Sequence, residues 1–122
     1  MIKTHGLTHV QLTVRDLKAS LAFYQGVFGM ELDAGRGDDT LAFLRTPGAV
    51  DTITLRRSEG GEATGPGGGV QHIGFRLQDR ADLEAALEEV VAAGGKVVER
   101  GEHAPGLAYA YVSDPDGYLI EF

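Results

Sequence analysis

The sequence predicts an α+β protein in which two βαβββ modules of one chain form a cupped, partly closed mixed sheet. Two segments, residues 9–14 and 72–77, each begin with a histidine and then alternate apolar with polar residues. Such alternation is typical of a strand with two unlike faces. Each segment is followed by an aspartate and a helical pattern, and each half then offers three further strand-like segments. The same order of elements is therefore expected twice.

In the first half, the apolar residues of the opening segment share one face and His9 lies on the other. A helical pattern follows Asp16 and stops near Gly29. Aspartate is a preferred N-cap and glycine a preferred helix terminator, so we expect a helix between them. The remaining strands of this half are expected at residues 31–34, 40–45 and 51–57.

The second half repeats this pattern. His72 takes the place of His9, Asp79 that of Asp16, and two glycines at 94 and 95 end the helix. Strands are then expected at residues 96–100, 108–113 and 118–122. We therefore expect a single domain over 1–122, with module one at about 5–57, a glycine-rich linker at 58–69 and module two at 70–122.

Composition excludes several classes of function. The chain of 122 residues has no cysteine, so it has neither a disulfide nor a thiolate ligand or nucleophile. Its formal net charge of -7 argues against nucleic-acid and acidic-membrane partners, which need clustered basic residues. No apolar run approaches the length of a membrane helix, and the N-terminus lacks the apolar core of a signal peptide. We expect a cytoplasmic protein.

Three residues suggest a metal site. His9 and His72 hold equivalent places on the two opening strands, on the face away from the apolar residues. Glu121 is expected on the same inward side of the last strand, where an unpaired carboxylate would be costly. Two imidazoles and one carboxylate form a facial triad that leaves coordination positions open for a substrate. The alternative is two core histidines and a surface glutamate.

Other side chains are candidates for contact with the substrate. Tyr111 lies ten residues before Glu121 across an expected hairpin, so its phenol is placed to donate a hydrogen bond near the metal. The alternative for Tyr111 is core packing. By strand parity Arg45 or Arg76 could bind a carboxylate or phosphate of the substrate, the alternative being a solvated edge residue.

Several motifs carry a family resemblance. They are residues 7–14, 16–20, 23–24, 28–30, 70–75 and the run Asp114-Pro115-Asp116-Gly117-Tyr118-Leu119-Ile120-Glu121. Together they resemble the vicinal oxygen chelate superfamily of glyoxalase I, extradiol dioxygenases, fosfomycin-resistance transferases, methylmalonyl-CoA epimerase and bleomycin-resistance proteins. The resemblance implies paired βαβββ modules, a homodimer, a small-molecule substrate, and a divalent metal on His9, His72 and Glu121.

Within that superfamily, the pattern favours one branch. Thr54 stands where glyoxalase-like enzymes carry a fourth metal ligand, and threonine is a poor replacement. The ending, with Gly101-Glu102-His103 followed by Tyr111 and Glu121, resembles the ring-cleaving dioxygenases, which implies catalytic roles for Tyr111 and His103. Dioxygenase-like chemistry with Fe(II) or Mn(II) is therefore favoured, with Zn or Ni possible. The alternatives are a glyoxalase-like lyase or isomerase, a fosfomycin-type thiol transferase, and a non-enzymatic drug-binding protein.

Overall fold

The computed structural model describes residues 3, 9–67 and 72–122. The elements of the first half are β1 (Val10–Val14), α1 (Leu17–Phe28), β2 (Glu31–Leu32), β3 (Leu41–Arg45) and β4 (Ile53–Arg57). Those of the second half are β5 (Ile73–Gly74), the 3-10 helix η1 (Arg80–Asp82), α2 (Leu83–Ala92), β6 (Lys96–Ala104), β7 (Leu107–Ser113) and β8 (Leu119–Glu121). The module starts expected at residues 5 and 70, and the linker end at 69, lie outside the described residues.

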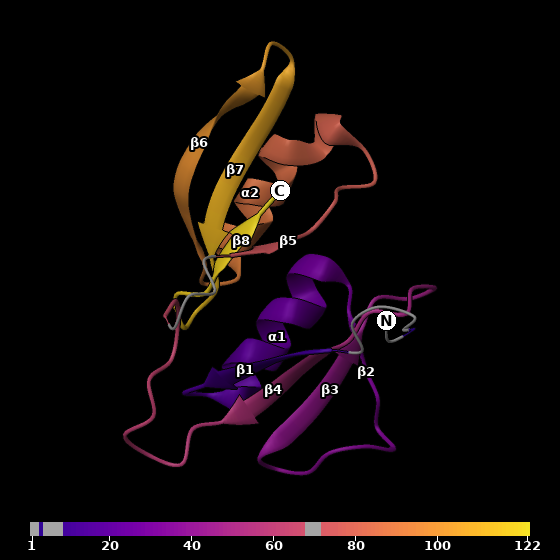
Figure 1. Ribbon diagram of the computed structural model, residues 1–122, viewed down its shortest axis with the longest axis vertical. Coiled ribbons are helices and arrows are strands. Elements are labelled where there is room, and N and C mark those ends of the chain that lie inside the picture. The colour runs from indigo at the N-terminus through magenta and orange to yellow at the C-terminus, as the bar shows by residue number, and fades with distance from the viewer. Residues whose placement is uncertain (1–2, 4–8, 68–71) are drawn as a thin grey trace.

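The predicted α+β class with two βαβββ modules is confirmed. Each half forms a four-stranded mixed sheet, in the orders β1-β4-β3-β2 and β5-β8-β7-β6. In both sheets the first strand pairs in parallel with the fourth, and the other pairs are antiparallel. Over the described residues the two sheets share no hydrogen-bonded strand pair, so they meet as two units and not as one continuous sheet (Figure 1).

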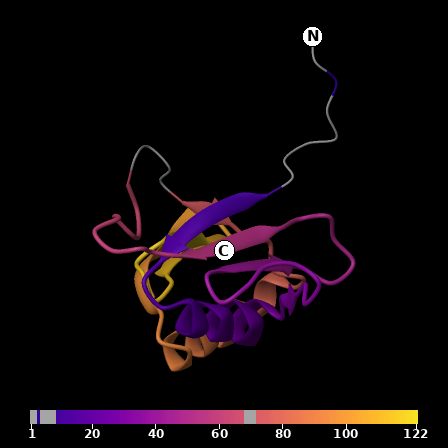
Figure 2. The same ribbon diagram turned by 90° about the horizontal axis from the view of Figure 1, so that it is seen from below.

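Both helices lie on the same side of the two sheets (Figure 2). The Asp16 carboxylate caps α1 by accepting a hydrogen bond from the Ala19 amide, and Gly29 ends the helix in the left-handed conformation. The apolar faces of both sheets pack against these helices and form the core. On the second sheet, Tyr111 of β7 and Glu121 of β8 lie on the opposite face. In the described part of the chain, no helix is long and apolar enough to cross a membrane.

Two strands differ most in length from the prediction. The segment expected at 72–77 is a strand only at Ile73–Gly74, because its sole partner β8 ends at Glu121 and a strand without a partner leaves its backbone unpaired. The strand expected at 96–100 extends to Ala104, since β7 pairs with it along almost its whole length. His103, which the prediction leaves between the strands at 96–100 and 108–113, is therefore part of β6.

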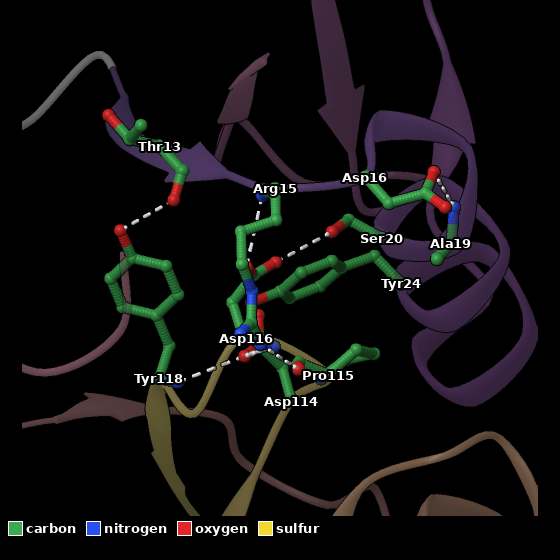
Figure 3. Close-up of polar contacts among 10 residues, drawn as sticks. All are labelled: Thr13, Arg15, Asp16, Ala19, Ser20, Tyr24, Asp114, Pro115, Asp116 and Tyr118. Atoms are coloured by element: carbon green, nitrogen blue, oxygen red, sulfur yellow. Dashed lines mark hydrogen bonds and ion pairs between the residues drawn. The ribbon is translucent and has the colours of Figure 1, made fainter. Parts of the chain in front are cut away.

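The two modules are joined by a buried polar contact at the turn between β7 and β8 (Figure 3). The Tyr24 hydroxyl on α1 donates a hydrogen bond of 3.1 Å to Asp114 Oδ2. The other oxygen of Asp114 accepts from the amides of Asp116 and Tyr118 and so fixes the turn that leads into β8. Arg15, at the end of β1, pairs with Asp116 at 3.0 Å. The start of β8 is thus tied to module one.

Burial shapes the electrostatics of this contact. It raises the pKa of Asp114 above its ordinary value, although two backbone amides and the Tyr24 hydroxyl stabilise the carboxylate. Burial and the facing Asp114 also raise the pKa of Tyr24, so its hydroxyl remains a proton donor. An apolar contact adds to the polar one, since the rings of Phe28 on α1 and Phe75 beyond β5 stack at 4.2 Å.

Tyr24→Phe should lower the free energy of unfolding by about 1–3 kcal/mol, because it leaves a buried carboxylate oxygen of Asp114 without its donor. Urea denaturation followed by circular dichroism measures the change. Tyr109→Phe likewise removes a tyrosine hydroxyl, but that hydroxyl donates to the solvent-exposed Glu99. This control should therefore lower the free energy of unfolding much less. Equal effects of the two variants would show that the Tyr24–Asp114 contact does not stabilise the fold.

Candidate functional site

The candidate site is centred on Glu121. Parallel pairing of Ile73 with Ile120 places Ile120 in the core and turns Glu121 to the opposite face. His72, just before β5, lies one diagonal step away, and its Nε2 is 2.9 Å from Glu121 Oε2. Tyr111 on β7 is the direct cross-strand partner of Glu121, as the hairpin spacing predicted. The structure therefore brings three of the predicted site residues together.

His103 joins the site from the far edge of the sheet. A register shift between Glu102 and Ala104 makes a β-bulge at His103, and bulges commonly re-aim a side chain. Its Nε2 lies 3.0 Å from Glu121 Oε1. The imidazole ring stacks on Tyr109 with centroids 4.3 Å apart, which supports its reach across β7.

Tyr109 and Gly101 together position the His103 imidazole, a role that the sequence did not predict for either residue. A Cβ atom at Gly101 would stand 2.8 Å from the Tyr109 ring, so the absence of a side chain lets that ring lie over β6. The Tyr109 hydroxyl then donates to Glu99 at 2.6 Å. A glycine inside a strand, opposite an aromatic residue, is the signal in the sequence that could have indicated this contact.

The surroundings of Glu121 favour its ionised form. Its pKa is held below the ordinary value, first by the hydrogen bond to His103 and then by the charge of His72 and a hydrogen bond from Tyr111. Burial and the nearby Glu121 charge raise the pKa of Tyr111, so the phenol stays protonated and able to donate. Glu121 is thus an anionic carboxylate surrounded by donors at neutral pH.

His72 and Glu121 are spaced as two ligands of one divalent metal ion would be. Two ligands about 2.1 Å from one ion and at right angles to each other lie about 3 Å apart. His72 Nε2 and Glu121 Oε2 have nearly that separation, 2.9 Å. The two imidazoles contact different oxygens of Glu121, so the carboxylate can serve an ion on the His72 side and His103 on the other. Among the described residues, the buried His72 Nδ1 has no hydrogen-bond partner.

Two predicted positions lie in module one. His9 directly precedes β1 and is exposed. No three histidine, aspartate or glutamate side chains of residues 9–67 and 72–122 lie together in an arrangement that could hold a metal ion. Thr54 pairs with Gln11 as Glu121 pairs with Gly74, so it is the repeat equivalent of Glu121. Its hydroxyl is buried and has no hydrogen-bond partner within residues 9–67 and 72–122.

Two pockets flank the cluster. One, of about 490 Å³, is lined by residues of module two that include Glu121, His103 and Tyr109. The other, of about 340 Å³, is lined by His72 together with Val10 and Leu12 of β1. Both volumes are in the range of small-molecule sites. A small molecule in the larger pocket would contact Glu121 directly.

Comparison with known proteins places these observations in a family context. Residues 6–122 match the Glyoxalase/Bleomycin resistance protein/Dioxygenase superfamily. A lactoylglutathione lyase of Neisseria meningitidis serogroup A is 38% identical, over 95% of this chain and 88% of that protein. An ethylmalonyl-CoA/methylmalonyl-CoA epimerase of Cereibacter sphaeroides is 28% identical, with 94% of each chain covered.

A solved structure agrees with this match. The crystal structure of a glyoxylase/bleomycin resistance protein/dioxygenase domain from Frankia superimposes with a TM-score of 0.77. It is 30% identical, and the match covers 98% of this chain and 96% of that one. The similarity therefore spans both modules.

His103→Ala should raise the pKa of Glu121 towards its ordinary value, since the bond to His103 is the main stabiliser of the carboxylate. Carbon-13 NMR titration of glutamate side chains in metal-free protein measures this shift. Arg100→Ala is the matched control, because it removes a cation of the same strand that pairs with Glu84. An unchanged Glu121 pKa in His103→Ala would contradict the assigned contact.

Proposed function

Because the chain belongs to the glyoxalase/bleomycin resistance protein/dioxygenase superfamily, we propose that it is a divalent-metal-dependent lyase or isomerase. Its substrate is a small molecule with two neighbouring oxygens. The 2.9 Å approach of His72 to an ionised Glu121 carries this proposal. The relatives' names, lactoylglutathione lyase and methylmalonyl-CoA epimerase, support the choice of reaction. Both names refer to thioesters. In each, the carbon beside the thioester carbonyl carries an oxygen-bearing group, a hydroxyl in one and a carboxylate in the other, and such a pair of oxygens suits an open metal site.

His72 and Glu121 hold the ion, and His9 supplies the third protein ligand. When bound, the ion supplies Lewis-acid polarisation of a substrate oxygen. Fe(II) or Mn(II) suits this set of two nitrogens and one oxygen, and Zn or Ni is accommodated as well. Thr54 leaves the fourth protein position without a strong ligand, which keeps room for both oxygens of the substrate.

The other residues handle protons. His103 is about half exposed, faces the larger pocket and is hydrogen-bonded to the Glu121 oxygen that does not face His72. An imidazole in this place can take a proton from the carbon beside a carbonyl and return it, as a general base and then a general acid. Tyr111 donates to Glu121 and orients the carboxylate. The catalytic assignments of His103 and Tyr111 rest on these contacts.

Ring-cleaving dioxygenase chemistry, which the sequence favours, is the second candidate. Two features favour it. Tyr111 and His103 both contact the Glu121 carboxylate, and the fourth ligand position holds only Thr54. It requires Fe(II) or Mn(II), oxygen and a catechol. The two candidates therefore differ in both substrate and oxygen dependence.

Metal-loaded protein should isomerise the glutathione hemithioacetal of a 2-oxoaldehyde or epimerise methylmalonyl-CoA. His72→Ala and Glu121→Gln should each weaken metal affinity by about a hundredfold or more, since loss of groups beyond the ligand shell alone costs about 10–100-fold. His103→Gln should reduce kcat while metal affinity changes little. Calorimetry with Mn, Fe, Ni and Zn, and progress curves for each substrate, measure these effects.

The control for these variants is Arg57→Gln, which removes a charge from module one at a distance from the cluster. Unchanged metal affinity in both His72→Ala and Glu121→Gln would rule out the proposed ligands. Oxygen-dependent cleavage of catechols by the Fe(II) protein, without turnover of the hemithioacetal or of methylmalonyl-CoA, would favour the second candidate over the first.

We further propose that the site is shared between two copies of the chain in a homodimer, with His9 contributed by the second copy. Glu121 draws its polar contacts from His72, His103 and Tyr111 of its own module. Module one carries His9 at an exposed position directly before β1, which is an edge strand of its sheet. An arrangement in which module one of each copy faces module two of the other brings the ligands together.

Mixing two inactive variants tests the shared site. If the sites are shared, a heterodimer of His9→Ala and Glu121→Gln chains has one intact site, so refolding the mixture should restore up to about a quarter of wild-type activity. If each site lies within one chain, every site lacks a ligand and the mixture stays inactive. Each variant refolded alone is the control.

A further inference from the structure

We propose that Arg76 and Arg80 form an anion-binding subsite in the larger pocket. The subsite takes the carboxylate or phosphate end of a substrate whose middle is apolar. This inference deepens the proposed function, on which it rests, by naming the substrate class: an anionic small molecule with an apolar stretch between its charged end and its reacting oxygens.

The pocket connects the arginines with the cluster around Glu121. Its volume is about 490 Å³, and its lining includes Arg76, Arg80, Glu121 and His103. Arg76 lies beyond the end of β5, and Arg80 begins η1. A molecule that fills the pocket therefore touches Glu121 and His103 with one part and comes within reach of two guanidinium groups with another.

The two arginines differ from most arginines of the chain in lacking an acidic partner. Ion pairs join five arginines to carboxylates: Arg15–Asp116, Arg36–Asp33, Arg45–Glu31, Arg56–Glu62 and Arg100–Glu84. In the described part of the chain, the side chains of Arg76 and Arg80 form no hydrogen bond or ion pair, although the Arg80 carbonyl accepts from the Leu83 amide. The chain has 18 acidic residues against 11 basic ones, so two arginines without an acidic partner in the lining of one pocket are unusual. They are available to an external anion.

The rest of the lining sets the character of the ligand. Phe75, Leu77, Leu83, Leu107 and Phe122 give the pocket apolar walls. Apolar walls favour a hydrocarbon or aromatic stretch in the ligand, while the planar fork of arginine suits carboxylate and phosphate oxygens. The charged end of the ligand is therefore directed to the arginines, and its other end to the metal ligands.

Binding of three matched probes to metal-free protein tests the subsite: 3-phenylpropanoate, 3-phenylpropanamide and 2-phenylethyl phosphate. We expect at least one of the two anions to bind about tenfold or more tightly than the neutral amide. The preferred anion identifies the charged group as a carboxylate or a phosphate. Titration followed by amide chemical shifts measures each affinity, and the shifts should concentrate at Phe75 and Leu107.

Variants assign the preference to these residues. Arg76→Gln/Arg80→Gln should bind anions no better than the amide, whereas Arg57→Gln should keep the wild-type preference. Both arginines are exposed, so their replacement should leave the melting temperature unchanged. Equal binding of the anions and the amide by wild-type protein, or loss of the preference in Arg57→Gln as well, would overturn the proposal. Because the protein is metal-free throughout, the result does not depend on whether the metal-dependent reaction exists.

Discussion

The parallel pairing of β5 with β8 is the constraint on which the site depends. Only two residue pairs form this ladder, yet they place Ile120 in the core and Glu121 beside His72. A slip of one residue would reverse these faces, since successive side chains of a strand point to opposite sides. The carboxylate would then lie against the helices without a partner, and the candidate site would be lost.

So short a ladder needs support from outside, and the contact between the modules provides it. Asp114 holds the turn before β8 through two backbone amides, and its remaining oxygen is fixed by Tyr24 of α1. The residue that begins this turn is therefore anchored in module one, seven positions before Glu121 along the chain. This arrangement couples the stability of the contact between the modules to the geometry of the site.

Much of the fold and of the candidate site could be predicted from the sequence, because it depends on the two-residue period of a strand and on which of its two faces each side chain occupies. Alternation located β1 and β8, and the repeat placed His72 on the face of Glu121; hairpin spacing placed Tyr111 opposite it. The length of β5 and the place of His103 could not be predicted in this way. The first depends on where its partner ends, and the second on a bulge and on a tyrosine ring that packs over Gly101. Both are properties of pairs of strands, which a single segment does not encode.

The central claim is that His72 and Glu121 hold a divalent ion, with His9 of a second copy as the third ligand. The most direct measurement is anomalous X-ray diffraction from crystals grown with Mn or Ni. We predict one strong peak for each chain, within about 2.0–2.3 Å of His72 Nε2 and of a Glu121 oxygen. Absence of a peak at this position in crystals saturated with metal, or peaks only at other carboxylates, would contradict the account.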